Sequence, residues 1–228
     1  MLEILRHNAD SFGPLARAMS EIPLWIYAIL LFAIVVSTTV HEAAHAWVAD
    51  RLGDPGPREQ GRISLNPMRH FDWLGLAIMG VTLLIGFPIG WGKSLKTDPS
   101  KYRCGARKGA AYVGAAGPLA NLALAIALSP LVRLVLEGVI PPTPLVVYVF
   151  YVLVYTLLIS VSQFCFNLLP IHPMDASHVV LGLLPEKLGD AYQNFMQRWG
   201  VYLFLVMMFT EIPSKLLFPL PCAGSSGC

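Results

Sequence analysis

Three long stretches without a charged residue constrain this chain more than any other feature of its sequence. They run from Ile22 to Val40, from Ala110 to Val132 and from Leu145 to Leu169. A helix needs about 20 mainly apolar residues to cross the hydrocarbon core of a bilayer. Only 13% of the 228 residues are charged, whereas a soluble domain averages about 25%. The sequence therefore predicts an all-α polytopic membrane protein, and nucleic acid is not expected among its partners.

Residues 1–228 are expected to form a single membrane-embedded domain, because no segment between the apolar stretches is long enough for a separate soluble domain. The core of this domain is expected at residues 22–185, and the Gly/Ser-rich tail at 221–228 is expected to be mobile. The four cysteines include no Cys-x-x-Cys pair. No disulfide framework is therefore predicted.

The number of membrane crossings is expected to be four to five. The stretch Leu74–Gly92 is apolar but broken by glycines and a proline, which suits a re-entrant segment. Residues 185–198 are polar enough for a surface helix or loop, and the apolar run at 201–210 could extend to residue 220 to make a crossing. Ile63 and Leu65 alternate with polar neighbours, which predicts a short strand in a β-hairpin.

The first apolar stretch leads directly into the sequence His41-Glu42-Ala43-Ala44-His45. Two histidines four residues apart lie on one face of a helix and can bind the same metal ion. The adjacent glutamate is placed to act as a general base, as in zinc peptidases. Burying charged groups in a membrane costs about 2.5–3.5 kcal/mol per charged centre, which makes such residues functional candidates. A lone pair of helical histidines can also form simple hydrogen bonds, so the motif calls for a further ligand.

The expected third ligand is Asp175. A catalytic zinc ion is commonly held by three protein ligands, and Asp175 follows the third apolar stretch where two prolines interrupt the helix. His172 is interpreted as a polar residue of the turn, with an additional ligand or a partner of a ligand kept as the alternatives. His178 lies within reach of the site and His70 is interpreted as a loop residue, and neither is assigned a role.

Taken together, these motifs resemble the site-2 protease family of intramembrane zinc metalloproteases. The motifs are His41–His45, Asn167-Leu168-Leu169-Pro170 and the downstream Asp175, and the resemblance extends from about Ile22 to Val180. The stretches Gly61–Pro67 and Gly117–Asn121 also resemble compact prokaryotic members of that family. One departure is Ala176, which follows Asp175 where the family usually has glycine and which removes backbone freedom without removing a ligand.

The resemblance implies a set of roles for residues of this chain. One zinc ion per chain would be held by His41, His45 and Asp175, with Glu42 as the general base. Asn167 would hold the scissile carbonyl, and Asn121 would bind substrate near the site. The implied reaction is hydrolysis of peptide bonds in membrane-anchored proteins, within or near the membrane. The implied setting is a multi-pass protein of a prokaryotic plasma membrane, in contact with lipid.

Substrate binding is also expected along the predicted strand. A helical substrate hides its carbonyl groups and must unwind before it is cut, and an extended peptide can then pair with an exposed strand edge. Ile63 and Leu65 mark the expected edge, and proline at either position is predicted to abolish cleavage while zinc stays bound.

The site also predicts how the helices are oriented. The metal ligands follow the ends of the first and third apolar stretches, so these two must run in the same direction and the second must return between them. The basic loop Trp91–Lys108 then lies on the side of the site. Because basic loops face the cytoplasm, the site is expected to open toward the cytoplasm.

Two alternative functions remain compatible with the sequence. The same histidine and aspartate cluster could serve a metal-ion transporter, although transporters favour repeated halves and no repeat is visible. A catalytically inactive relative could bind membrane helices without cutting them. Serine and aspartyl intramembrane proteases are disfavoured, because neither Gly-x-Ser-Gly nor Gly-x-Gly-Asp occurs within the apolar stretches.

Overall fold

The computed structural model describes residues 23–84, 93 and 95–208 of the chain. The helices in these residues are α3 (Leu24–Leu52), α4 (Gly56–Glu59), the 3-10 turn η1 (Pro67–Arg69), α5 (Trp73–Leu83), the 3-10 turn η2 (Pro99–Lys101), α6 (Ala106–Leu136), α7 (Pro144–Asn167), α8 (Ala176–Leu183) and α9 (Glu186–Met208). The tail at 221–228 and the extension of the last apolar run through 209–220 lie outside the described residues.

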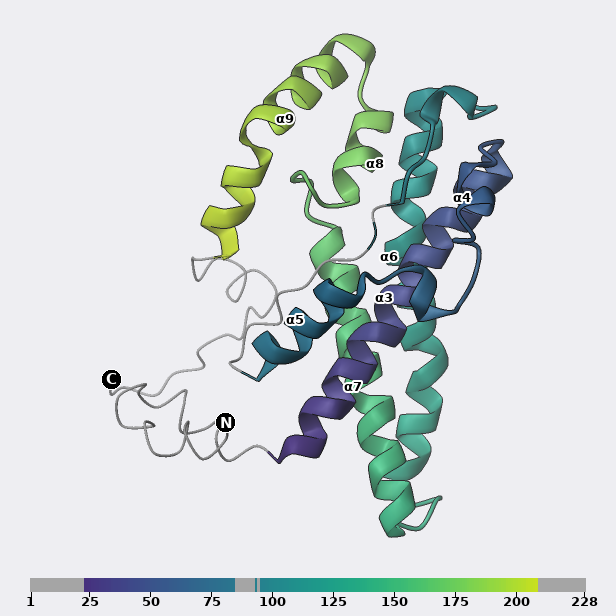
Figure 1. Cartoon of the computed structure of the whole chain (residues 1–228), viewed down its shortest axis with the longest axis vertical. Coiled ribbons are helices and arrows are strands. Elements are labelled where there is room, and N and C mark those ends of the chain that lie inside the picture. The colour runs from purple at the N-terminus through teal and green to yellow at the C-terminus, as the bar shows by residue number, and fades with distance from the viewer. Residues whose placement is uncertain (1–22, 85–92, 94, 209–228) are drawn as a thin grey trace.

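Three of these helices, α3, α6 and α7, are long and apolar enough to cross a membrane. Figure 1 shows α3 and α7 running in the same direction, with α6 running in the opposite direction beside them. The expected all-α membrane fold and the expected orientation of the three stretches are therefore found. The described residues supply three of the four to five crossings that the sequence suggested.

Each long helix begins or ends at a residue whose chemistry explains the boundary. Gly53 ends α3 with a φ of 117°, a left-handed conformation that glycine adopts without steric cost. Thr143 caps α7 by accepting a hydrogen bond from the Val146 amide. Asp72 caps α5 in the same way, with its carboxylate accepting from the amides of Leu74 and Gly75. These caps satisfy amides that have no partner within the helix.

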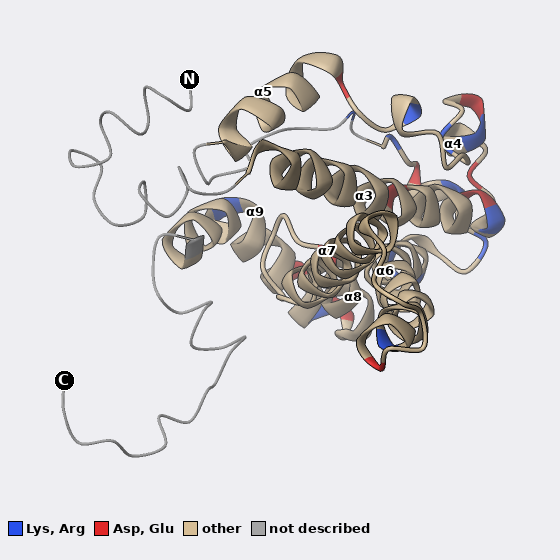
Figure 2. Ribbon diagram, turned by 90° about the horizontal axis from the view of Figure 1, so that it is seen from below, with Lys and Arg blue, Asp and Glu red and all other residues tan. Residues whose placement is uncertain are grey.

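Helix α5 is too short to cross a bilayer, with 11 residues against the roughly 20 required. It lies beside the first half of α3 in Figure 1, where Gly80 approaches the side chain of Leu31. The rest of the expected re-entrant stretch, residues 85–92, is outside the described residues. Figure 2 shows that α5 and α7 carry no charged residue, whereas charged residues gather around α4.

The strand predicted at Ile63 and Leu65 does not form. Residues 63–65 are bends, and the described part of the chain contains no β-strand. The polar neighbours make local bonds instead: the Ser64 hydroxyl accepts from the Asn66 amide, and Asn66 caps η1 by accepting from the Met68 amide. Alternation of apolar and polar residues requires a pairing strand to become a β-ladder, and the described residues supply none.

The polar stretch at 185–198 and the apolar run after it form one continuous helix, α9. It runs back beside α8 on the side of the bundle away from α4 (Figure 1). Gly200 makes this approach possible, because a Cβ built on it would lie 2.8 Å from the Cβ of His172. The sequence left open whether the polar part is a surface helix or a loop, and the structure shows a helix that continues directly into the apolar run.

Candidate metal centre

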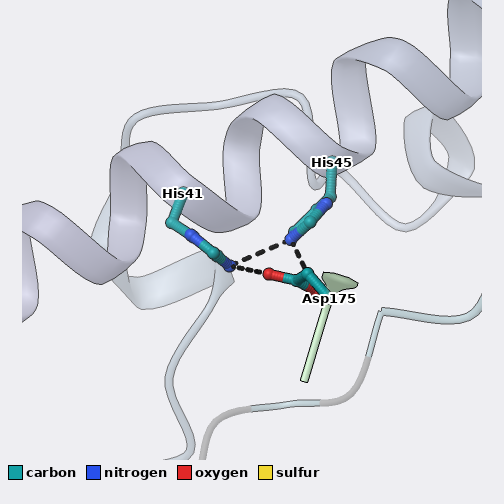
Figure 3. A group of neighbouring side chains, drawn as sticks. All are labelled: His41, His45 and Asp175. Atoms are coloured by element: carbon teal, nitrogen blue, oxygen red, sulfur yellow. Dashed lines mark hydrogen bonds and ion pairs between the residues drawn. The ribbon is translucent and has the colours of Figure 1, made fainter. Parts of the chain in front are cut away.

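The three expected metal ligands lie together near the C-terminal end of α3. His41 and His45 are one turn apart on that helix, and Asp175 reaches them from the residue before α8 (Figure 3). The two Nε2 atoms are 2.9 Å apart. The Asp175 carboxylate places Oδ2 3.0 Å from His41 Nε2 and Oδ1 3.4 Å from His45 Nε2. Three side chains from distant parts of the sequence therefore converge on one point.

This donor set fits a zinc ion. Tetrahedral zinc with bonds of about 2.0–2.2 Å places neighbouring ligand atoms about 3.3–3.6 Å apart, close to the spacings found. Asp175 Oδ2 is buried and has no hydrogen-bond partner of suitable geometry, although it lies 3.0 Å from His41 Nε2. A buried anionic oxygen without a hydrogen bond is expected where a cation binds.

The ionisation of Asp175 also suits metal binding. Burial raises the pKa of its carboxyl group, but hydrogen bonds and charge interactions with His41 and His45 outweigh burial and hold the pKa well below its usual range. The carboxylate is therefore ionised at neutral pH, and a ligand must be deprotonated to bind a metal.

The backbone of α6 orients the ring of His45. His45 Nδ1 lies 2.6 Å from the carbonyl oxygen of Val113. A carbonyl can only accept, so Nδ1 carries the proton and donates it. The lone pair of the neutral ring is then on Nε2, which faces Asp175. This hydrogen bond fixes His45 in the form that can bind a metal.

Helix α6 can approach the two imidazoles because it presents glycine there. A Cβ built on Gly117 would lie 2.4 Å from His45 Nε2 and 2.6 Å from His41 Nε2. One turn earlier, a Cβ built on Gly114 would lie 2.8 Å from the carbonyl oxygen of Asp175. Any other residue at these positions would push α6 away from the ligands. Gly114 and Gly117 thus lie directly against the metal site.

The ligands form the floor of an open cleft with a volume of about 380 Å³. Glu42 and Asn167 also line this cleft, so the expected general base and the expected carbonyl-binding residue are both beside the ligands. The Asn167 side chain donates one N–H to the carbonyl oxygen of Gln163 at 3.0 Å. Its second N–H is available for another acceptor.

A buried arginine lies on the Glu42 side of the site. Arg62 is 4% exposed, and it donates to the carbonyl oxygen of Lys93. Burial lowers the pKa of its guanidinium, and the negative charge of Glu42 acts in the opposite direction. Arginine remains protonated under ordinary conditions, so Arg62 supplies a positive charge on the Glu42 side of the site.

Of the other candidate residues, only His178 lines the cleft. Asn121 is 0% exposed and sits behind His41, with its amide nitrogen 3.2 Å from His41 Nδ1; its contact with substrate remains a prediction. Ile63 and Leu65 are not among the residues that line the cleft. His172 packs against Gly200 of α9, and His178 is in the cleft wall.

Comparison with known proteins identifies relatives that share this chemistry. The "Putative zinc metalloprotease YwhC" of Bacillus subtilis (strain 168) is 31% identical over 203 residues, which cover 89% of this chain and 90% of the relative. The chain belongs to the same family as this zinc metalloprotease. The "Putative zinc metalloprotease Rip2" of Mycolicibacterium smegmatis (strain ATCC 700084 / mc(2)155) is 28% identical over 219 residues, covering 93% of this chain and 76% of the relative. No family model and no solved structure matches the chain.

Membership of a zinc metalloprotease family agrees with the donor set of His41, His45 and Asp175. The sequence reasoning missed two parts of this metalloprotease site. Val113 acts through its backbone carbonyl, which no side-chain pattern reveals. Gly117 precedes a proline inside an apolar stretch, and this Gly-Pro pair within a predicted helix was the available signal.

Proposed function

We propose that this metalloprotease is of the site-2 protease type and hydrolyses peptide bonds of membrane-anchored proteins within or near the membrane. The observation that supports this function best is the position of Glu42. It lines the same cleft as His41, His45 and Asp175, and it lies on α3, one of the helices apolar enough to cross a membrane. Cutting a substrate beside the bilayer requires a general base and a metal site in one cleft on a membrane-spanning helix.

Catalysis is divided between the metal and two side chains. His41, His45 and Asp175 would hold the zinc ion, which would supply a Lewis acid for the scissile carbonyl and for the attacking water. Glu42 accepts the proton of the attacking water and delivers it to the leaving amine. The free N–H of Asn167 donates to the carbonyl oxygen as negative charge develops on it. The hydrogen bond from Asn167 to the Gln163 carbonyl holds this donor in place.

An extended substrate backbone finds a pairing edge at residues 95–98 rather than at Ile63 and Leu65. These residues lack helical structure, and both Leu95 and Thr97 line the cleft. Their neighbours face the other way, since the Lys96 carbonyl accepts from Gln60 at 2.7 Å and the Asp98 amide donates to the Asp54 carboxylate at 2.7 Å. Alternate residues of an extended segment point in opposite directions, so the backbone groups of Leu95 and Thr97 face the cleft and can pair with a peptide.

The cleft is proposed to open toward the cytoplasm. Described residues of the basic loop adjoin the C-terminal end of α3, where the Arg103 amide donates to the Leu52 carbonyl at 2.9 Å. Basic loops are retained on the cytoplasmic side of a membrane. The chain is accordingly a multi-pass protein whose substrates are unwound and cut near the cytoplasmic surface.

The test is to purify the chain with Glu42→Gln and measure both zinc content and cleavage of a membrane-anchored model substrate. The variant should keep one zinc ion per chain, because the three ligands are intact, and should lose cleavage by about 10²- to 10⁴-fold. Glu59→Gln, on the exposed helix α4, is the matched control and should cleave normally. Cleavage that survives Glu42→Gln would refute the proposed role. Zinc flux into liposomes that survives the same change would indicate a metal-ion transporter.

A further inference from the structure

A chain of buried and half-buried polar side chains connects His41 to helix α7. The Asn121 amide nitrogen lies 3.2 Å from His41 Nδ1 and 2.9 Å from Gln163 Oε1. The other end of the Gln163 amide lies 2.8 Å from the Thr38 hydroxyl. Ser37 lies 2.9 Å from Gln163 Oε1 and 3.5 Å from Asn121 Oδ1. The chain therefore joins α3, α6 and α7 behind the metal centre.

These hydrogen bonds can be arranged in two ways, because the oxygen and nitrogen of an amide have almost the same size and place. In one arrangement Asn121 donates to His41 Nδ1, so the proton of the neutral ring is on Nε2, the atom that faces Asp175. In the other, both amides are turned by half a rotation. Gln163 then donates to Asn121 Oδ1, and that oxygen accepts from His41 Nδ1–H.

The hydroxyl groups favour the second arrangement. Ser160 lies 2.7 Å from the carbonyl oxygen of Thr156 and must donate its proton there. The contact of 3.0 Å between Ser37 and Ser160 is then a hydrogen bond only if Ser37 donates. With its single proton used, Ser37 can only accept from its neighbours. Gln163 must therefore turn its N–H toward Ser37, and buried polar groups are expected to be satisfied in this way.

The metal requires the same arrangement. A histidine that binds zinc through Nε2 carries its proton on Nδ1 and needs an acceptor for that proton. His41 points Nε2 toward Asp175 and Nδ1 toward Asn121. If Asn121 pointed its amide N–H toward His41, that N–H and the Nδ1–H of His41 would face each other once the metal is bound.

We infer that Gln163 is a positioning residue for the metal: it donates to Asn121 Oδ1 and so keeps that oxygen as the acceptor for His41 Nδ1–H. Thr38 completes the chain by donating to Gln163 Oε1. Gln163 thus acts on the ligand through Asn121, without touching metal or substrate. The inference depends on the proposed function only for the identity of the ion.

The test is the zinc dissociation constant of the full chain in detergent, measured by competition with a chromophoric chelator. Gln163→Met keeps the length of the side chain without its donor and should weaken zinc binding by about 10- to 100-fold, as is usual when the partner of a ligand is lost. Asn121→Leu should do the same. Asn121→Asp should bind zinc at least as tightly as the wild type, because a carboxylate accepts from both His41 and Gln163.

Thr156→Val is the matched control. It removes a buried hydroxyl from the same helix, where it bonds only to the Val152 carbonyl, and it should leave zinc binding unchanged. If the network were merely structural, these substitutions would lower thermal stability without producing this pattern of zinc affinities. Wild-type zinc affinity in Gln163→Met, or equal losses in Asn121→Asp and Asn121→Leu, would overturn the inference while the Glu42→Gln result still stood. If the wild type itself binds no zinc, the proposed function fails as well.

Discussion

Gly117 lies so close to His45 that a single added methyl group would meet the metal-binding nitrogen, with a Cβ 2.4 Å from Nε2. This contact joins the middle helix of the bundle to the ligands on α3. The site can therefore form only with glycine at position 117.

The first prediction is that Gly117→Ala weakens zinc binding strongly. Overpacking of this kind costs about 1–3 kcal/mol, which corresponds to roughly 5- to 150-fold in affinity. The dissociation constant for zinc measures the effect. Gly80→Ala is the control, since its Cβ would lie 3.8 Å from Leu31, an ordinary contact. Equal affinities in the two variants would show that α6 does not shape the site.

Asp175→Asn is predicted to reduce zinc content and to abolish cleavage. The change removes the one anionic ligand while keeping the shape of the side chain, so the ion loses its strongest electrostatic partner. Metal analysis after gel filtration measures the loss. Asp190→Asn, which alters an exposed ion pair with Arg107, should retain full zinc content. Full occupancy in Asp175→Asn would remove Asp175 from the ligand set.

Metal removal is predicted to lower the thermal stability of the wild-type chain. A ligand present at 100 times its dissociation constant stabilises the folded state by about 2.7 kcal/mol. Thermal unfolding in detergent, with zinc and after chelation, should show this difference in the wild type and in Glu42→Gln. Asp175→Asn should show little difference, because its site no longer holds the ion firmly. A chelator effect of the same size in Asp175→Asn would mean that zinc binds elsewhere.

Thr97→Pro is predicted to reduce cleavage by about 10-fold or more while zinc content is unchanged. Proline removes the backbone N–H that faces the cleft, and a substrate strand would lose a main-chain hydrogen bond. Lys96→Pro is the comparison, because the Lys96 amide faces Gln60 at 3.3 Å and not the cleft. Ile63→Pro should have little effect, contrary to the expectation from the sequence. Normal cleavage by Thr97→Pro would exclude this edge.

The ligands could be predicted from the sequence because helical geometry fixes them locally. His41 and His45 share a helix face through their spacing alone, and Asp175 stands out as an acidic residue after an apolar stretch. The three long helices could also be predicted, because each contains an uncharged stretch long enough to cross a bilayer. In each case the deciding information lies within one segment of the chain.

The remaining features depend on contacts across the bundle. The Val113 carbonyl reaches His45, and the Gln163 amide reaches Asn121 behind His41, only after α3, α6 and α7 have packed, so no local pattern reveals these contacts. The strand prediction at Ile63 was wrong for the same reason, since alternating apolar and polar residues form a β-ladder only beside a partner strand.

The order of the ligands along the chain has a consequence for biosynthesis. Both imidazoles leave the ribosome with the first long helix, whereas their carboxylate partner follows only after the other two have been made. A nascent chain held in the translocon therefore lacks an assembled centre. The three side chains can come together only when the last of these helices has docked.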